Sequence, residues 1–145
     1  MNLNELKDLA VNAAIEAGDY LNQSKLEEKK VLKEEGRDIK LIIDQDTEKL
    51  IRSILQVTDI PILGEEYGGD IADGIYWVID PIDGTANYFR GLDECCVSIA
   101  LMEGEEALIG VIYNFNNDQM YAAIKDQGAF LNNTKISVSD IASRD

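Results

Sequence analysis

The 145-residue sequence predicts one α+β domain, in which two helices pack on a mainly antiparallel sheet. Two segments with helical spacing of apolar residues come first, and a series of short apolar runs separated by turn residues follows them. This order differs from the regular alternation of strands and helices that builds a parallel sheet. The sequence has no internal repeat or low-complexity tract, so we treat residues 1–145 as one unit.

The first helix is predicted over about residues 4–23, where leucines and alanines recur at helical spacing. Residues 25–38 are highly charged and contain Gly36, so we expect an exposed hairpin or a mobile loop there. The second helix is predicted over residues 44–57, and Asp44 suits its positively polarised start. Its buried face consists of four apolar residues: Leu50, Ile51, Ile54 and Leu55.

Seven strands are predicted in the rest of the chain, because short apolar runs alternate there with glycine, asparagine and aspartate. The predicted strands cover residues 60–63, 75–79, 95–102, 107–113, 119–124, 129–132 and 136–138. The last five follow one another through short turns, which favours antiparallel pairing of neighbours.

Composition and charge exclude several classes of function. Lys and Arg number 13 against 28 Asp and Glu, and the resulting net charge of −15 would repel a nucleic-acid backbone. No apolar run approaches the roughly 20 residues of a membrane-spanning helix, so no membrane partner is expected. Histidine is absent, which excludes Ser-His-Asp and Cys-His catalysis and zinc held by histidine. Cys95 and Cys96 are adjacent and unsuited to bridging each other, and the amphipathic N-terminus is unlike a signal peptide, so we expect a reducing, cytoplasmic location.

The clearest chemical signal is the segment Trp77-Val78-Ile79-Asp80-Pro81-Ile82-Asp83-Gly84-Thr85. A buried strand would deliver Asp80 at its end, with Asp83 close enough to face the same cavity. Gly84 permits close approach of the backbone to a ligand, and its N–H and that of Thr85 suit an anion. Carboxylates beside backbone donors are typical of sites where hard cations bridge a phosphate. The competing interpretation is a strand-end turn with solvated acids.

Two further acidic segments precede it. Glu65 and Glu66 follow an apolar run and Gly64, so one of them could join the same cation site, although surface loops often carry such pairs. Asp44 and Asp46 follow the apolar residues 41–43, and a helix start with acids at its positive end explains them equally well.

Other phosphate and cation motifs do not fit. An apolar strand before Asp44-x-Asp46 would suggest a haloacid dehalogenase-type aspartyl phosphatase, but Glu48 stands where that family has Thr or Val. The sequence has no Gly-x-x-x-x-Gly-Lys loop, and the spacing of Asp80, Ile82 and Gly84 does not match an EF-hand.

Taken together and in this order, the three acidic segments resemble the inositol monophosphatase family. The resemblance rests on the central signature 80–85, on Gly64-Glu65-Glu66, and on Asp44 placed before Glu48. It continues through Asn87-Tyr88 and three later segments: residues 97–100, 110–113 and 128–132. This resemblance covers nearly the whole chain and implies the N-terminal domain of a layered α/β sugar-phosphatase fold.

The resemblance also implies roles for individual residues. Metal ligands would be Glu65, Asp80, the Ile82 carbonyl and Asp83, which together would hold two or three Mg²⁺ ions. Gly84 and Thr85 would bind the substrate phosphate through their N–H groups. Thr85, with Glu65 or Asp44, would orient and activate the attacking water, and Lys33 would lie in a mobile loop near the third metal.

The implied activity is magnesium-dependent hydrolysis of a small polyol phosphate such as myo-inositol monophosphate, by a homodimer. Fructose-1,6-bisphosphatase or 3′-phosphoadenosine 5′-phosphate phosphatase activity stays open as an alternative. The family's second half carries an Asp that completes the second metal site, and we expect that C-terminal domain to be absent from this chain. A non-catalytic half that binds metal and phosphate is therefore a second hypothesis.

Overall fold

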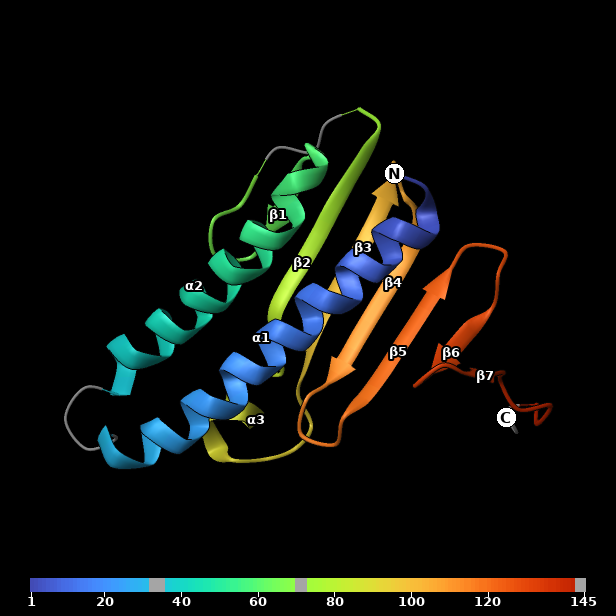
Figure 1. The fold of residues 1–145 in the computed structure, drawn as a ribbon. Helices are drawn as coiled ribbons and strands as arrows, with labels where there is room; N and C mark the ends of the chain where they lie inside the picture. Colours follow the sequence, from blue (N-terminus) through green and yellow to red (C-terminus); the bar gives the residue numbers. More distant parts are fainter. Residues whose placement is uncertain (32–35, 70–72, 143–145) are drawn as a thin grey trace.

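The computed structural model describes residues 1–31, 36–69 and 73–142, and Figure 1 shows how their elements are arranged. The helices are α1 (Leu3–Val31), α2 (Gly36–Leu55) and the short α3 (Thr85–Arg90), with a 3₁₀ turn at Gln56–Thr58. The strands are β1 (Ile62–Gly64), β2 (Ile75–Asp83), β3 (Cys96–Glu103), β4 (Glu106–Asn114), β5 (Gln119–Ile124), β6 (Ala129–Leu131) and β7 (Thr134–Ile136). They form a single sheet in the order β1 to β7.

The predicted α+β class is confirmed, and the sheet is antiparallel except at one edge. Strand β1 pairs with β2 in parallel, while each later pair of neighbours is antiparallel. A parallel pair needs a crossover, and the long excursion from β1 to β2 provides it. The carboxyl end of β1 therefore lies beside the carboxyl half of β2.

Both long helices extend further than the sequence predicted. Helix α1 continues eight residues beyond 23 to Val31, and α2 begins at Gly36 instead of residue 44. The charged residues expected to form a hairpin or loop are thus helical on both sides of 32–35, since Lys and Glu favour helices. Residues 41–43 are also helical, which removes the strand that the dehalogenase comparison required. Helix α3 was not predicted.

The core lies between the two long helices and one face of the sheet (Figure 1). Small residues line the side of α1 that meets the sheet, and a Cβ at Gly18 would lie 2.6 Å from the Tyr113 ring. Trp77, Ile99 and Val111 supply buried side chains from β2, β3 and β4. Burial of this apolar area is the main favourable contribution to folding. In the part of the chain that is described, no helix is long and apolar enough to span a bilayer.

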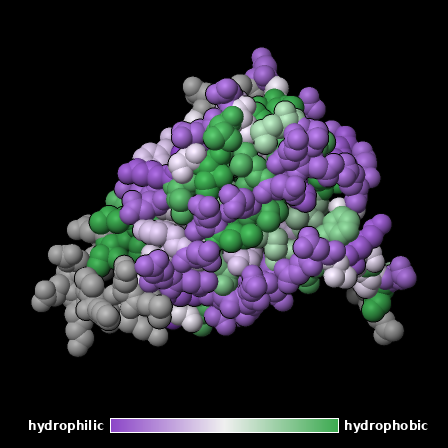
Figure 2. All heavy atoms as spheres, in the orientation of Figure 1, coloured by the Kyte–Doolittle hydropathy of each residue, from purple (hydrophilic) through white to green (hydrophobic). Residues whose placement is uncertain are grey.

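The helix-covered side of the molecule exposes both hydrophobic and hydrophilic side chains, and the two kinds lie in separate groups. Figure 2 shows hydrophobic side chains gathered between hydrophilic ones on this side of the molecule. The opposite face of the sheet leaves two large apolar side chains partly exposed, Ile112 at 47% and Tyr121 at 37%. The two residues are cross-strand partners in β4 and β5, so they lie side by side on that face.

Candidate metal and phosphate site

The parallel pairing of β1 with β2 brings the first two acidic segments together. Gly64 of β1 pairs with Ile79 of β2, so the residues that follow them, Glu65 and Asp80, lie next to each other, just after β1 and in the carboxyl half of β2. The two side chains interact, because the Glu65 carboxylate is one of the causes that raise the pKa of Asp80. The structure thus brings together two groups that are fifteen residues apart in the sequence.

Asp80 is in an unfavourable position for a carboxylate. Its pKa is raised to about 7, first by burial and then by Glu65 and Asp83, while a hydrogen bond from the Ile82 N–H opposes the shift. Its Oδ1 atom is buried and has no hydrogen-bond partner among the described residues. A buried carboxylate oxygen without a donor is costly unless a cation or a proton satisfies it.

Helix α2 adds one further acidic side chain, Asp44, to this edge. The pKa of Asp44 is raised to about 6, mainly by burial and further by the charges of Glu66 and Glu65. The pKa of Glu66 is also raised, by burial and by Glu65 and Glu48. Asp44 therefore lies within electrostatic range of the turn after β1. We refer to Asp44, Glu65, Glu66, Asp80 and Asp83 as the carboxylate edge.

The end of β2 turns sharply into α3. The register with β3 shifts between Asp80 and Asp83, and Gly84 then adopts a left-handed φ of 88°. A Cβ at Gly84 would also lie 2.7 Å from the Glu94 carbonyl oxygen, so this position requires glycine on two counts. The turn directs the start of α3 toward the same end of β2 as Asp80 and Asp83.

Thr85 is the first residue of α3, and its hydroxyl donates a 2.9 Å hydrogen bond to the Ile82 carbonyl. The Ile82 carbonyl has a second lone pair, so this bond leaves it able to accept another contact. The N–H groups at the start of a helix have no acceptor within the helix itself. The arrangement thus provides a hydroxyl, a carbonyl and backbone donors beside the carboxylates.

Comparison with known proteins decides which family this arrangement belongs to. The sequence model described as the inositol monophosphatase family matches residues 2–144. The chain belongs to the inositol monophosphatase family. The expected family membership is therefore confirmed.

Individual relatives are moderately similar to this chain. The Nus factor SuhB of Xylella fastidiosa is 39% identical over 137 residues, covering 92% of this chain and 50% of that protein. The inositol-1-monophosphatase of Bacillus subtilis is 36% identical over 143 residues, covering 94% and 54%. A solved inositol monophosphatase from Anabaena superposes with a TM-score of 0.81 at 31% identity, covering 97% and 52%. The chain spans about half the length of these relatives.

The residues present suit Mg²⁺, although the carboxylates do not form a closed cage. Among the described residues, no three Asp, Glu or Cys side chains are grouped so that they could hold an ion by themselves. Mg²⁺ does not need such a cage, since it keeps several waters and is commonly bound by one or two carboxylates and the substrate phosphate. Glu65 and the unpartnered oxygen of Asp80 provide oxygen donors of this kind. Lys33 lies outside the described residues.

Sequence reasoning missed an ion pair that lies behind the turn carrying Glu65. Glu48 and Arg52 are one helical turn apart in α2, and the Glu48 side chain is fully buried. A signal was present: Glu48, Ile51 and Leu55 share one side of the helix, so helical spacing places Glu48 on the buried face. Sequence reasoning also missed Cys96 as a neighbour of the site. Cys96 of β3 lies opposite Asp83 of β2 in the sheet. Burial, together with the charges of Asp83 and Asp80, raises the pKa of its thiol to about 11.

Proposed function

We propose that the protein containing this chain hydrolyses phosphomonoesters of small polyols, such as myo-inositol monophosphate, in a magnesium-dependent reaction. The observation that carries the proposal is the buried Oδ1 atom of Asp80, which has no hydrogen-bond partner among the described residues and lies beside Glu65, next to the start of α3. Family membership supports a phosphatase. The raised pKa of Asp80 supports a cation at this position, since a cation favours the charged carboxylate that the metal-free fold disfavours.

The chain's own residues would divide the work by their chemistry. Glu65, Asp80, Asp83 and the Ile82 carbonyl provide oxygen atoms for two or three Mg²⁺ ions. Bound Mg²⁺ supplies neutralisation of the phosphate charge and lowers the pKa of bound water. Aligned N–H groups of Gly84 and Thr85 would receive the phosphate oxygens.

Orientation of the attacking water falls to Thr85 and its acidic neighbours. The Thr85 hydroxyl is held by the Ile82 carbonyl, which fixes its oxygen as an acceptor at the start of α3. Glu65 or Asp44 would take the proton, and the raised pKa of Asp44, about 6, suits a base near neutral pH. Correct placement of a nucleophile commonly accounts for several orders of magnitude in rate.

The finer features of the proposal are a small phosphorylated substrate, a homodimer and a cytoplasmic location. The net charge of −15 supports the absence of a nucleic-acid partner. Since the chain spans about half the length of its relatives, we further propose that turnover requires a second half of the kind that they have. The alternative is a half that binds metal and phosphate without turning substrate over.

The test is phosphate release from myo-inositol 1-phosphate, with and without Mg²⁺, by the complete product of the gene and by residues 1–145 alone. We expect magnesium-dependent release from the complete product, and weak Mg²⁺ binding without turnover by the 145-residue chain. Absence of release from the complete product, with Mg²⁺ binding retained, would favour the non-catalytic alternative. Fructose 1,6-bisphosphate and 3′-phosphoadenosine 5′-phosphate as parallel substrates test the other two activities.

Replacing Thr85 with alanine separates the roles within the site. We expect Thr85→Ala to retain Mg²⁺ binding and to lose at least two orders of magnitude in turnover, because its hydroxyl is assigned to the water. Thr134→Ala, on the exposed strand β7, is the matched control and should leave turnover unchanged. Near-normal turnover of Thr85→Ala would remove Thr85 from the mechanism.

A further inference from the structure

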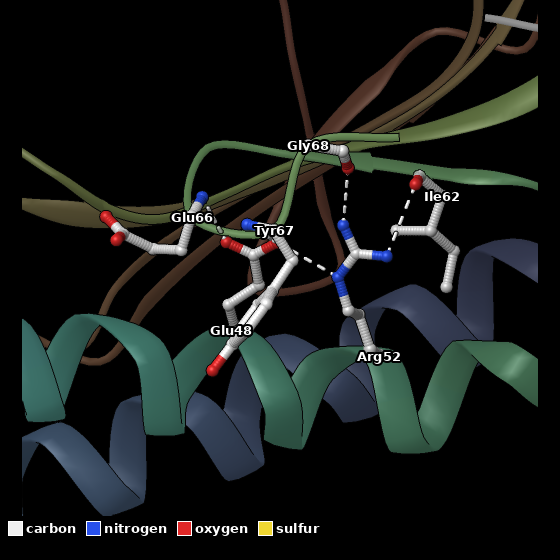
Figure 3. Close-up of polar contacts among 6 residues, drawn as sticks. All are labelled: Glu48, Arg52, Ile62, Glu66, Tyr67 and Gly68. Carbon is white, nitrogen blue, oxygen red and sulfur yellow. Dashed lines mark hydrogen bonds and ion pairs between the residues drawn. The ribbon is translucent and has the colours of Figure 1, made fainter. Parts of the chain in front are cut away.

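We propose that Glu48, together with Arg52, is a positioning residue that fixes the turn carrying Glu65, and thereby sets the affinity of the carboxylate edge for Mg²⁺. This inference rests on the proposed function, because it assigns a purpose to contacts that lie behind the proposed metal ligands. Neither residue is assigned as a ligand or as a contact of the substrate. Figure 3 shows the contacts.

The buried carboxylate of Glu48 organises the backbone immediately after Glu65. Its Oε2 accepts a 2.6 Å hydrogen bond from the N–H of Glu66, and its Oε1 accepts one of 3.2 Å from the N–H of Tyr67 (Figure 3). Two consecutive backbone donors thus converge on one side chain. Glu65 is the residue directly before these two anchored amides, so the position of its carboxylate depends on them.

Arg52 completes the support from the same helix. Its Nε donates a 2.9 Å hydrogen bond to Oε1 of Glu48, which neutralises the buried charge. Its two terminal nitrogens donate to the carbonyls of Ile62, at 3.3 Å, and Gly68, at 2.6 Å (Figure 3). These carbonyls flank the turn on both sides, so one guanidinium ties strand β1 to the end of the turn. A planar group with five donors suits this task better than an ammonium.

The sequence makes room for this arrangement at Gly64. A Cβ at that position would lie 2.6 Å from Cδ of Glu48 and 2.9 Å from a terminal nitrogen of Arg52. The N–H of Gly64 also donates a 2.9 Å hydrogen bond to the Gly68 carbonyl and closes the turn. Asp44 lies one turn before Glu48 on α2, so the same helix places one acid at the edge and anchors the turn that carries another.

A purely structural role predicts a different outcome from a positioning role. Burying a charged pair is seldom the most stable choice, since apolar residues of similar volume often stabilise a protein as well or better. Partners of metal ligands typically change metal affinity or activity by about 10–100-fold when they are removed. The decisive readout is therefore the Mg²⁺ requirement, measured separately from stability.

The experiment compares Glu48→Gln with Glu106→Gln in the complete gene product. Glu106 pairs with Lys125 on the exposed surface, so its replacement removes one acid from an ion pair far from the site. The glutamine amide would place an NH₂ group, which cannot accept a hydrogen bond, opposite at least one of the three groups that donate to Glu48: the Arg52 Nε and the N–H groups of Glu66 and Tyr67. We expect Glu48→Gln to raise the Mg²⁺ concentration for half-maximal phosphate release about 10–100-fold, with an unchanged KM for myo-inositol 1-phosphate at saturating Mg²⁺. Glu106→Gln should leave both values as in the wild type.

Two further measurements keep the inference testable on its own. Arg52→Lys retains both charges but loses part of the backbone contacts, so a smaller shift in the same direction is expected even where Glu48→Gln does not fold. Amide hydrogen exchange in residues 1–145 should be slow at Glu66 and Tyr67, and fast in the Glu48 or Arg52 variants. An unchanged Mg²⁺ requirement, or amides that exchange equally fast in the wild type, would overturn the inference. A wild type without magnesium-dependent release but with protected amides would overturn the proposed function alone.

Discussion

The carboxylate edge and the antiparallel strands β3 to β6 differ in how their charged side chains are arranged. At the edge, several acids crowd together, and the pKa values of Asp80 and Asp44 rise to about 7 and about 6. In the antiparallel strands, the ion pair Glu106–Lys125 is exposed, at 56% and 40%, and joins two opposite charges across neighbouring strands. The second arrangement is ordinary for a surface, whereas the first is unfavourable for the metal-free fold. Such crowding is typical of functional sites, where local stability is sacrificed for binding.

Two of the ion pairs among the described residues, Glu48–Arg52 and Glu106–Lys125, sharpen the same contrast. Glu48 is fully buried and accepts three hydrogen bonds, two of them from backbone amides. Glu106 is largely exposed and contacts one lysine. A glutamate therefore anchors the backbone at the edge, whereas a glutamate in the antiparallel strands makes only a local surface contact.

The largest expected effect follows from Asp80→Asn in the complete gene product. Asp80 is a proposed Mg²⁺ ligand in the middle of the carboxylate edge, so its neutralisation should abolish magnesium-dependent phosphate release. The fold should persist, and the metal-free protein should become more stable near neutral pH, because the repulsion with Glu65 and Asp83 is relieved. Turnover and thermal unfolding with EDTA measure both effects. An active Asp80→Asn protein would contradict the metal-assisted reaction.

Replacing the basic residue of each ion pair should change the free energy of unfolding by very different amounts in the two regions. Arg52→Met leaves the buried Glu48 charge uncompensated, so the free energy of unfolding should fall by about 3–5 kcal/mol. Lys125→Met should produce no measurable change, because exposed pairs contribute little. Urea unfolding of both variants provides the measurement. Equal effects of the two substitutions would show that the Glu48–Arg52 pair has no special role.

Alanine at two glycine positions should change the free energy of unfolding by smaller amounts, with a loss at one position and no loss at the other. Gly64→Ala pushes a methyl group into the Glu48–Arg52 pair and should destabilise the chain by about 1–3 kcal/mol. Gly110→Ala, on β4, meets nothing within 4 Å and should be neutral or stabilise slightly, because alanine restricts the unfolded chain. Thermal unfolding distinguishes them. A Gly64→Ala variant as stable as Gly110→Ala would contradict the close packing around Glu48.

The smallest expected effect is a pH dependence of the metal-free chain. The pKa values of Asp80 and Asp44 are raised on folding, so between about pH 4 and about pH 7 the folded state binds more protons than the unfolded state. The free energy of unfolding should therefore fall as the pH rises through this range. Asp80→Asn should make the dependence shallower. Stability that rises from pH 4 to pH 7 in EDTA would contradict the raised pKa values.

The sequence by itself determined the class of fold and most of the strands, and it predicted the chemistry of the site. Alternating apolar residues and turn residues predicted the antiparallel strands, because hairpins form from neighbouring segments and need only local information. The segment 80–85 suggested a cation and phosphate site from its residue types, and the family resemblance added Glu65 and Asp44 to the predicted site. Absence of histidine and an excess of acids excluded the main alternatives.

Only the tertiary structure decided which of these groups meet and how they are held. The parallel pairing of β1 with β2 places Glu65 beside Asp80, and no local pattern announces a contact made through a crossover. Helical spacing places Glu48 on the buried face of α2, but only the tertiary structure shows the turn whose amides donate hydrogen bonds to its carboxylate. The extra length of α1 and α2 likewise depends on charged residues whose helical preference is weak without context. Residue types specify the available chemistry, whereas the contacts between distant segments determine burial and therefore pKa.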